Sequence, residues 1–231
     1  MKSWFSEAKP VSMLNAELCF LLKDSFYFGP DRHIGVDTSK FTQRLDLPKF
    51  PRSQPLMVRT SEFGGTEDEL SAYYKQVVKL AVHHGLPFNS IRHHFWVRFW
   101  MWNSEEDVHV SFPWYDSYSE VSRFLNALLS VESGEVDYDI DQGWEMEVEA
   151  YEGHVYIRQR DPDYDETHVC IRVPRDELIL QAQQVMARAT NAVKLLTEAM
   201  GEDIWTSYVR SEPVFMKKPA ARERKAWWRP W

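Results

Sequence analysis

Carboxylates recur at every second residue along two successive segments of the chain. The first segment carries Asp137, Asp139 and Asp141, and the second carries Glu145, Glu147 and Glu149. The positions between them are mostly apolar: Val136, Tyr138, Ile140, Trp144, Met146, Val148 and Ala150. Because successive side chains of a strand point to opposite faces, this alternation predicts two amphipathic strands whose acidic faces point outward together.

These carboxylates have no basic neighbours on their own segments, because no Lys or Arg occurs between Phe124 and Ile157. Closely spaced like charges repel one another, and a cationic partner would relieve that repulsion. We therefore expect the six carboxylates to bind a basic protein. The alternative is a solvated acidic face that maintains solubility.

Tryptophans supply the second set of candidate contacts. Trp96, Trp100 and Trp102 alternate along one predicted strand, and Trp is common among the residues that dominate binding energy. We expect Trp96 and Trp100 to anchor the same partner. The alternative is that a helix or the N-terminal segment covers this stripe.

Histidines offer a different chemistry. His93 and His94 would point to opposite faces of a strand and so cannot bind one metal, and the chain contains no HExxH motif. We expect no metal site and no cofactor. His94 and His109 would share a face, and either is a candidate base in the alternative function, a hydrolase-like enzyme with its site between the sheet and residues 1–60.

Other catalytic and metal-binding motifs are incomplete or absent. Asp161, Asp163 and Asp165 match the first ligands of a calcium loop, but Glu166 and Arg172 occupy the positions that need Gly and a bidentate Glu. These acids therefore predict a hairpin loop. The chain has no GxSxG motif, phosphate-binding loop or dinucleotide fingerprint, so we assign no catalytic residues.

Helices and strands that would position these residues follow from periodicity. A helix is expected near 67–84, opened by a capping box of Thr66 and Glu69 and ended at Gly85. Strands are expected over 93–102 and 107–114, with Met101 opposite Val108. A second helix starts at Ser117, and a long helix runs from Pro174 to Gly201.

A hairpin with its turn at 152–153 places apolar residues opposite apolar residues on one face and acidic residues opposite basic residues on the other. Val148 faces Ile157, while Glu147 faces Arg158 and Glu145 faces Arg160. A further strand follows at 169–173. This order of elements predicts an α+β fold, an antiparallel sheet of about five or more strands with helices mainly on one face.

Composition sets the domain organisation and the cellular context. The 231 residues carry a formal net charge of −8, distributed as +3 over 1–60, −16 over 61–215 and +5 over 216–231. Residues 1–212 are expected to form one α+β domain, in which the proline-rich 1–60 is irregular, and 213–231 a basic, Trp-rich tail. The acidic middle argues against nucleic acid as partner, and no apolar run is long enough for a membrane helix. Two cysteines without CxxC spacing fit a reducing cytoplasm.

Several stretches resemble the small acidic α+β immunity proteins of bacterial toxin–immunity systems. They are Gly143–Arg160, the acidic turn after it, Val169–Leu178 and the sequence Gly201-Glu202-Asp203-Ile204-Trp205-Thr206. The resemblance implies a non-enzymatic inhibitor that occupies the active cleft of a basic toxin domain. We expect that function, with the enzyme and a scaffold that docks through its tail as alternatives. Oligomeric state is left open.

Overall fold

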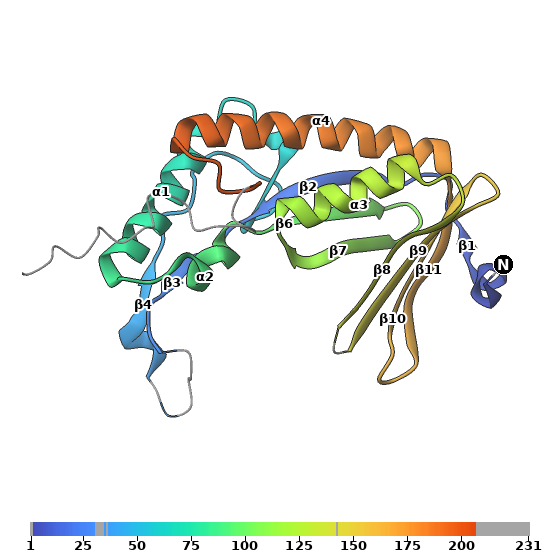
Figure 1. Cartoon of the computed structure of the whole chain (residues 1–231), viewed down its shortest axis with the longest axis horizontal. Helices are drawn as coiled ribbons and strands as arrows, with labels where there is room; N and C mark the ends of the chain where they lie inside the picture. The colour runs from blue at the N-terminus through green and yellow to red at the C-terminus, as the bar shows by residue number, and fades with distance from the viewer. Residues whose placement is uncertain (1, 31–34, 36, 142, 207–231) are drawn as a thin grey trace, which may run out of the picture.

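Strands fall into separate sheets beneath a layer of helices in the computed structural model, which describes residues 2–30, 35, 37–141 and 143–206, the side chains of 111–116 and 141 aside (Figure 1). The five-stranded sheet has the order β1 (Lys9–Pro10), β11 (Glu166–Pro174), β10 (His154–Asp161), β9 (Trp144–Tyr151) and β8 (Gly134–Asp141). The four-stranded sheet has the order β5 (Met57–Arg59), β2 (Asn15–Leu21), β6 (Val97–Asn103) and β7 (Val108–Asp116). Strands β3 (Ser25–Tyr27) and β4 (Thr42–Arg44) pair separately. The predicted α+β class is confirmed, with the strands divided among sheets.

Helices lie mainly on one side of the four-stranded sheet (Figure 1). They are α1 (Glu67–His84), α2 (Phe88–Ile91), α3 (Tyr118–Ser130) and α4 (Arg175–Met200), with short 3₁₀ turns η1 (Ser3–Glu7), η2 (Thr38–Phe41), η3 (Thr60–Glu62) and η4 (Arg92–His94). Ser117 and Glu120 form the capping box that starts α3. The capping box expected before α1 is wrong, because the Thr66 hydroxyl donates to the Phe63 carbonyl instead.

Residues 1–60 are not irregular throughout, contrary to expectation. Asn15–Leu21 forms β2, an inner strand of the four-stranded sheet with five consecutive buried residues. Its two neighbours, β5 and β6, lie more than 30 residues further along the chain, so the local pattern does not indicate an inner strand here. The proposed tail, 213–231, lies outside the described residues.

The hairpin of β6 and β7 has a different register from the one expected. Met101 lies opposite Val110, and Asn103 lies opposite Val108, so the loop is still four residues long but spans 104–107, one residue later than the predicted 103–106. A shift of two residues keeps the same side chains on the same face. The predicted apolar face therefore survives, while 92–94 leaves the strand and forms η4.

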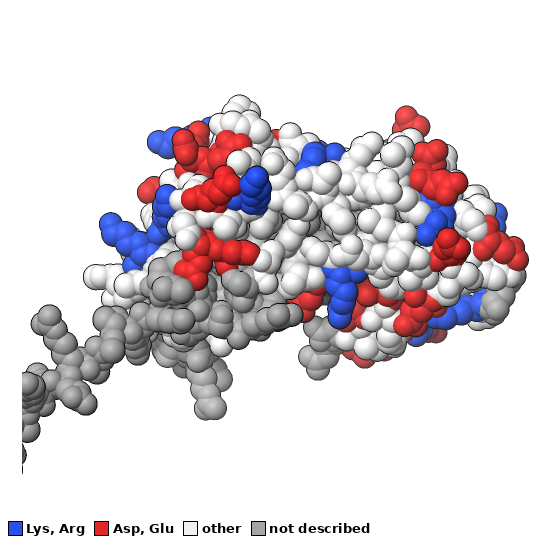
Figure 2. Space-filling view, turned by 45° about the horizontal axis from the view of Figure 1, so that its top comes forward, with Lys and Arg blue, Asp and Glu red and all other residues white. Residues whose placement is uncertain are grey.

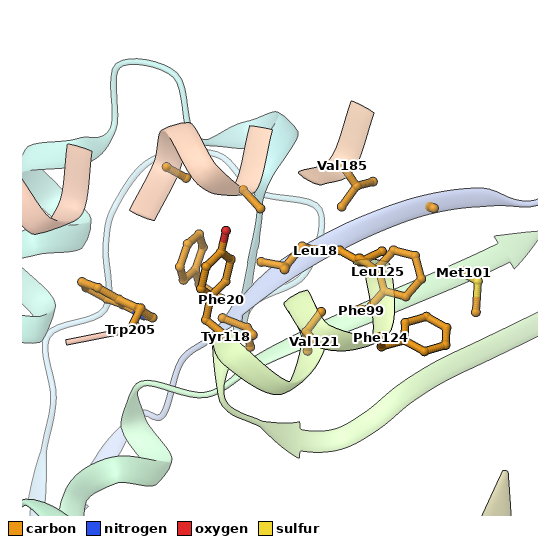
Figure 3. Close-up of a cluster of buried hydrophobic side chains, with 14 of the residues drawn as sticks. Leu18, Phe20, Phe99, Met101, Tyr118, Val121, Phe124, Leu125, Val185 and Trp205 are labelled. Atoms are coloured by element: carbon orange, nitrogen blue, oxygen red, sulfur yellow. The ribbon is translucent and has the colours of Figure 1, made fainter. Parts of the chain in front are cut away.

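One cluster of buried side chains connects both sheets and the helices. Figure 3 shows its centre, where Leu18 and Phe20 of β2 meet Val185 of α4 and side chains of α3 and β6. Trp205, which follows α4, is fully buried against Phe20. Helix α4 runs along the top of the molecule and contacts β2 of the four-stranded sheet as well as β10 and β11 of the five-stranded sheet (Figure 1).

The β9–β10 hairpin has the predicted register. Val148 pairs with Ile157, Glu147 with Arg158 and Glu145 with Arg160. Glu152 and Gly153 have positive φ angles of 46° and 74°, as a two-residue type I′ turn requires. The apolar partners face the core, and the charged partners lie on the opposite side, which is called the outer face below.

Candidate interaction surfaces

Glu145, Glu147 and Glu149 line the outer face of the five-stranded sheet, but they are not exposed. Their exposed fractions are 5%, 6% and 7%. Arg160 forms an ion pair with Glu145, and Arg158 forms one with Glu147. These ion pairs follow the predicted cross-strand register, but the glutamates are not available to a partner in the free protein, contrary to expectation, because they are buried and already have cationic partners.

The third neutralising group comes from the N-terminal segment, residues 2–8. Lys2 Nζ lies 3.0 Å from Glu147 Oε2 and 2.5 Å from Glu149 Oε1. The Trp4 indole N–H donates to Glu147 Oε2 over 3.1 Å. Burial alone would raise the pKa of Glu147, but hydrogen bonds from Arg158 and Lys2 lower it below the usual value. The glutamate row is thus an internal binding site for this segment.

Asp137 and Asp139 do not share the outer face with the glutamates, contrary to prediction. The pairing of β8 with β9 shifts between Glu135 and Asp137, so that Val136 is the extra residue of a β-bulge. Beyond the bulge the alternation is reversed. Asp137 and Asp139 now lie opposite Val148 and Met146, on the inner side.

The same reversal brings Tyr138 and Ile140 to the outer face, where they are 47% and 54% exposed. The Tyr138 hydroxyl donates to Glu145 Oε1 over 3.0 Å. The side chain of Asp141 lies outside the described residues. Beyond the bulge, strand β8 therefore presents Asp137 and Asp139 on the inner side and Tyr138 and Ile140 on the outer face, along an edge that no described strand pairs with. Glu135, before the bulge, lies opposite Glu149 on the outer face.

We call this surface the acidic edge and define it by five residues of β8: Glu135, Asp137, Tyr138, Asp139 and Ile140. Within the described residues, its three carboxylates form no ion pair within 4.0 Å, unlike the glutamate row of β9. Figure 2 shows acidic side chains at both ends of the molecule, with basic ones among them. The acidic residues thus form smaller patches, of which this edge is one.

The carboxyl of Asp137 has an unusual electrostatic environment. Burial raises its pKa to about 6; the guanidinium of Arg123 on α3 opposes this rise, and the charges of Asp139 and Glu135 add to it. A cation placed at this edge would favour the ionised form. The acidic edge is therefore a place where binding a basic side chain lowers an existing electrostatic cost.

Replacing Asp137 by asparagine is expected to stabilise the protein at pH 7 by about 1 kcal/mol, after allowance for solvent screening. The pKa of about 6 in the folded protein exceeds the usual 3.8. Ionisation of Asp137 therefore lowers the free energy of unfolding of the native protein as pH rises from about 4 through 6. The difference should vanish near pH 4. Urea unfolding at both pH values measures it, with the exposed Asp163→Asn as control. Equal effects of the two variants at pH 7 would contradict the prediction.

The loop between β10 and β11 is a hairpin turn, as predicted. Asp161 Oδ1 accepts hydrogen bonds from the backbone N–H of Asp163 at 2.9 Å and of Tyr164 at 3.3 Å. These hydrogen bonds stabilise the turn, which explains the presence of an aspartate at this position. Tyr164 at the tip is 82% exposed. Among the described residues, no group of three or more His, Cys, Asp or Glu side chains is placed to hold a metal ion.

The tryptophan stripe lies on the other sheet, on the face of the four-stranded sheet away from the helices. Trp100 and Trp102 stack with ring centroids 4.6 Å apart, and the Arg59 guanidinium lies 5.0 and 5.1 Å from their rings. Part of the N-terminal region thus covers the stripe, and both rings are half-buried. Trp96 lines a separate cavity of about 310 Å³. The structure therefore does not place Trp96 and Trp100 beside the acidic residues.

The two histidines considered as a catalytic base, His94 and His109, lie in different environments. His94 is buried in η4, where its ring stacks on Phe26 at 5.6 Å, and burial with the charges of His93 and Lys23 lowers its pKa to about 2. His109 is exposed on β7 beside Trp100. The expectation that His94 and His109 share one strand face is wrong, because His94 precedes β6.

Comparison of the chain with protein-family models, curated proteins and solved structures found no match. In the part of the chain that the structure describes, no helix has both the length and the apolar character to cross a bilayer. The function therefore has to be inferred from the surfaces above. Lys2, Trp4 and Arg59 were not identified as contact residues from the sequence. The one indication of their role is that they are basic or aromatic residues within the segment 1–60, which was expected to be irregular.

Proposed function

We propose that this chain is a non-enzymatic binding protein that captures a basic protein through the acidic edge. The observation that supports this most directly is the contrast between two acidic rows. The glutamates of β9 already have intramolecular partners, whereas Asp137 and Asp139 of β8 lie on an open sheet edge, where burial raises the pKa of Asp137 to about 6.

The surrounding chemistry suits a protein partner. Tyr138 and Ile140 supply exposed apolar area on the outer side of the same edge, and interfaces combine an apolar centre with a polar rim. The sheet region 132–177 holds 15 Asp and Glu against 4 Arg, so it also attracts cations over longer range. Such charge acts mainly on the association rate and on the choice of partner.

The resemblance to immunity proteins leads us to propose that the partner is a toxin domain that the chain inhibits stoichiometrically. The cytoplasm is the proposed compartment, which suits two cysteines that are both free. Binding alone would make this chain a binding protein. Loss of the partner's activity at equimolar ratio would make it an inhibitor.

Charge reversal at the acidic edge tests this proposal. The chain is immobilised, its basic partner is isolated from the source cells and identified, and the association rate is measured. Asp137→Lys combined with Asp139→Lys should slow association at least tenfold, and raised salt should slow the wild type. Glu177→Lys with Glu198→Lys, two exposed positions of α4, imposes the same charge change elsewhere and should have a much smaller effect. Equal effects of the two double variants, or a partner without net positive charge, would refute the proposal.

A further inference from the structure

The outer face of the five-stranded sheet already binds a peptide, and that peptide is the chain's own N-terminal segment. The carboxylates of Glu147 and Glu149 hold the Lys2 ammonium, and Glu147 also accepts the Trp4 indole N–H. Arg158, paired with Glu147, places its guanidinium 5.0 Å from the Trp4 ring. A buried carboxylate pair thus recognises one ammonium and one indole.

Aromatic packing supplies the second part of the site. Phe5 stacks on Tyr156 with ring centroids 4.1 Å apart and an interplanar angle of 15°, and it also contacts Tyr151 at 5.6 Å. Trp4 and Phe5 are only 3% and 6% exposed. Two adjacent aromatic residues therefore enter a surface lined by tyrosines, which is the kind of contact that dominates peptide binding.

Backbone pairing continues the segment along the sheet. Strand β1 pairs in parallel with β11, with Lys9 opposite Ile171 and Pro10 opposite Arg172. The Val11 N–H then donates to the Arg172 carbonyl over 2.9 Å. Addition of an extended segment to a sheet edge, with side chains in nearby pockets, is a common mode of peptide recognition.

The segment is packed separately from the rest of the molecule. Trp4, Phe5, Ala8 and Tyr156 form their own cluster of buried residues, apart from the core that begins at Val11. Removal of residues 2–8 therefore uncovers the outer face without removing a side chain from the main core. That face adjoins the acidic edge, because β8 pairs directly with β9.

We propose that the outer face is a peptide-binding site for a segment with a lysine two residues before a pair of adjacent aromatic residues. The N-terminal segment occupies it in the free protein, and a matching segment of the basic partner displaces it. The identity of the displacing partner rests on the proposed function, whereas the site itself does not. A tethered segment has an effective concentration in the millimolar range, so it excludes weak ligands from the intact protein.

The experiment uses a fluorescent peptide of residues 1–10 of this chain as the probe. A variant lacking residues 2–8 should bind it saturably, at least tenfold more tightly than the full chain does, by fluorescence anisotropy. Changing Trp4 to Ala in the peptide should weaken binding at least tenfold. Glu147→Gln in the truncated protein should do the same, whereas Asp163→Asn, which removes an exposed carboxylate elsewhere, should not.

A second variant guards against a truncated chain that fails to fold. The full chain with Lys2→Ala and Trp4→Ala keeps its length and should bind the wild-type peptide more tightly than the unaltered chain does. Absence of peptide binding by both variants would overturn the site, and so would binding that Glu147→Gln leaves unchanged. Neither result affects the charge-reversal test at Asp137 and Asp139, so the two proposals fail separately.

Discussion

Replacement of Trp205 by alanine is expected to lower the free energy of unfolding by about 3–5 kcal/mol. The ring is fully buried and packs edge-to-face on Phe20 at 6.1 Å, Tyr74 at 5.1 Å and Phe95 at 6.0 Å. These contacts join β2, α1 and the segment before β6, so the cavity would lie where three elements meet (Figure 3). Urea unfolding followed by circular dichroism measures the change.

The matched control for this prediction is Trp100→Ala. Trp100 is half-buried on β6, on the face of the four-stranded sheet that points away from the core. Its removal leaves no closed cavity in the main core. Its loss should be clearly smaller than that of Trp205. Similar losses for the two variants, or a loss below about 1 kcal/mol for Trp205→Ala, would show that Trp205 does not pack as described.

Replacement of Arg188 by methionine is expected to cost about 3 kcal/mol. Glu17 of β2 is only 3% exposed, and it accepts hydrogen bonds from the Thr60 hydroxyl and the Leu18 N–H. Arg188 of α4, with Nη2 3.4 Å from Glu17 Oε2, is the one cation within ion-pair distance of this carboxylate in the described structure. Its removal leaves a buried charge without compensation.

A double-mutant cycle separates that effect from lost packing. Adding Glu17→Gln to Arg188→Met removes the uncompensated charge, so the pair should be more stable than the single Arg188 variant. Urea unfolding of the four proteins yields the coupling energy. Strictly additive losses would mean that Glu17 and Arg188 do not interact energetically.

These pairs share one physical theme with the glutamate row of β9. Glu17 and Glu147 are both buried and paired with internal cations, Glu17 with Arg188 and Glu147 with Arg158. On the five-stranded sheet, by contrast, Glu135, Asp137 and Asp139 of the acidic edge form no ion pair within the described residues. For this reason the proposed partner surface is the acidic edge and not the glutamate row at the centre of the sheet.

Local pattern was sufficient for the β9–β10 hairpin. Its turn residues, its alternation and its cross-strand charge pairs all lie within a short stretch, so each constraint supports the same register. The helices α1 and α4 were predictable for a similar reason, because apolar periodicity and the terminal residues Gly85 and Gly201 define them locally.

Non-local pairings were not accessible in the same way. The bulge at Val136 leaves no mark in the alternation of β8, yet it moves Asp137 and Asp139 to the other side of the sheet. The role of β2 depends on neighbours more than 30 residues away in the chain, β5 and β6. The local sequence pattern therefore does not predict that Asn15–Leu21 forms an inner strand.

The amino-acid sequence by itself determined the fold class, the main helices and the excess of negative charge in the middle of the chain, because propensity, periodicity and charge are properties of short segments. Only the tertiary structure decided which carboxylates reach solvent. Lys2 and Trp4 lie about 145 residues from Glu147 in the chain, and their arrival on the same sheet face converts an apparent binding surface into an occupied one. Whether a charge is free depends on what folds against it, and segments distant in the chain supply that contact.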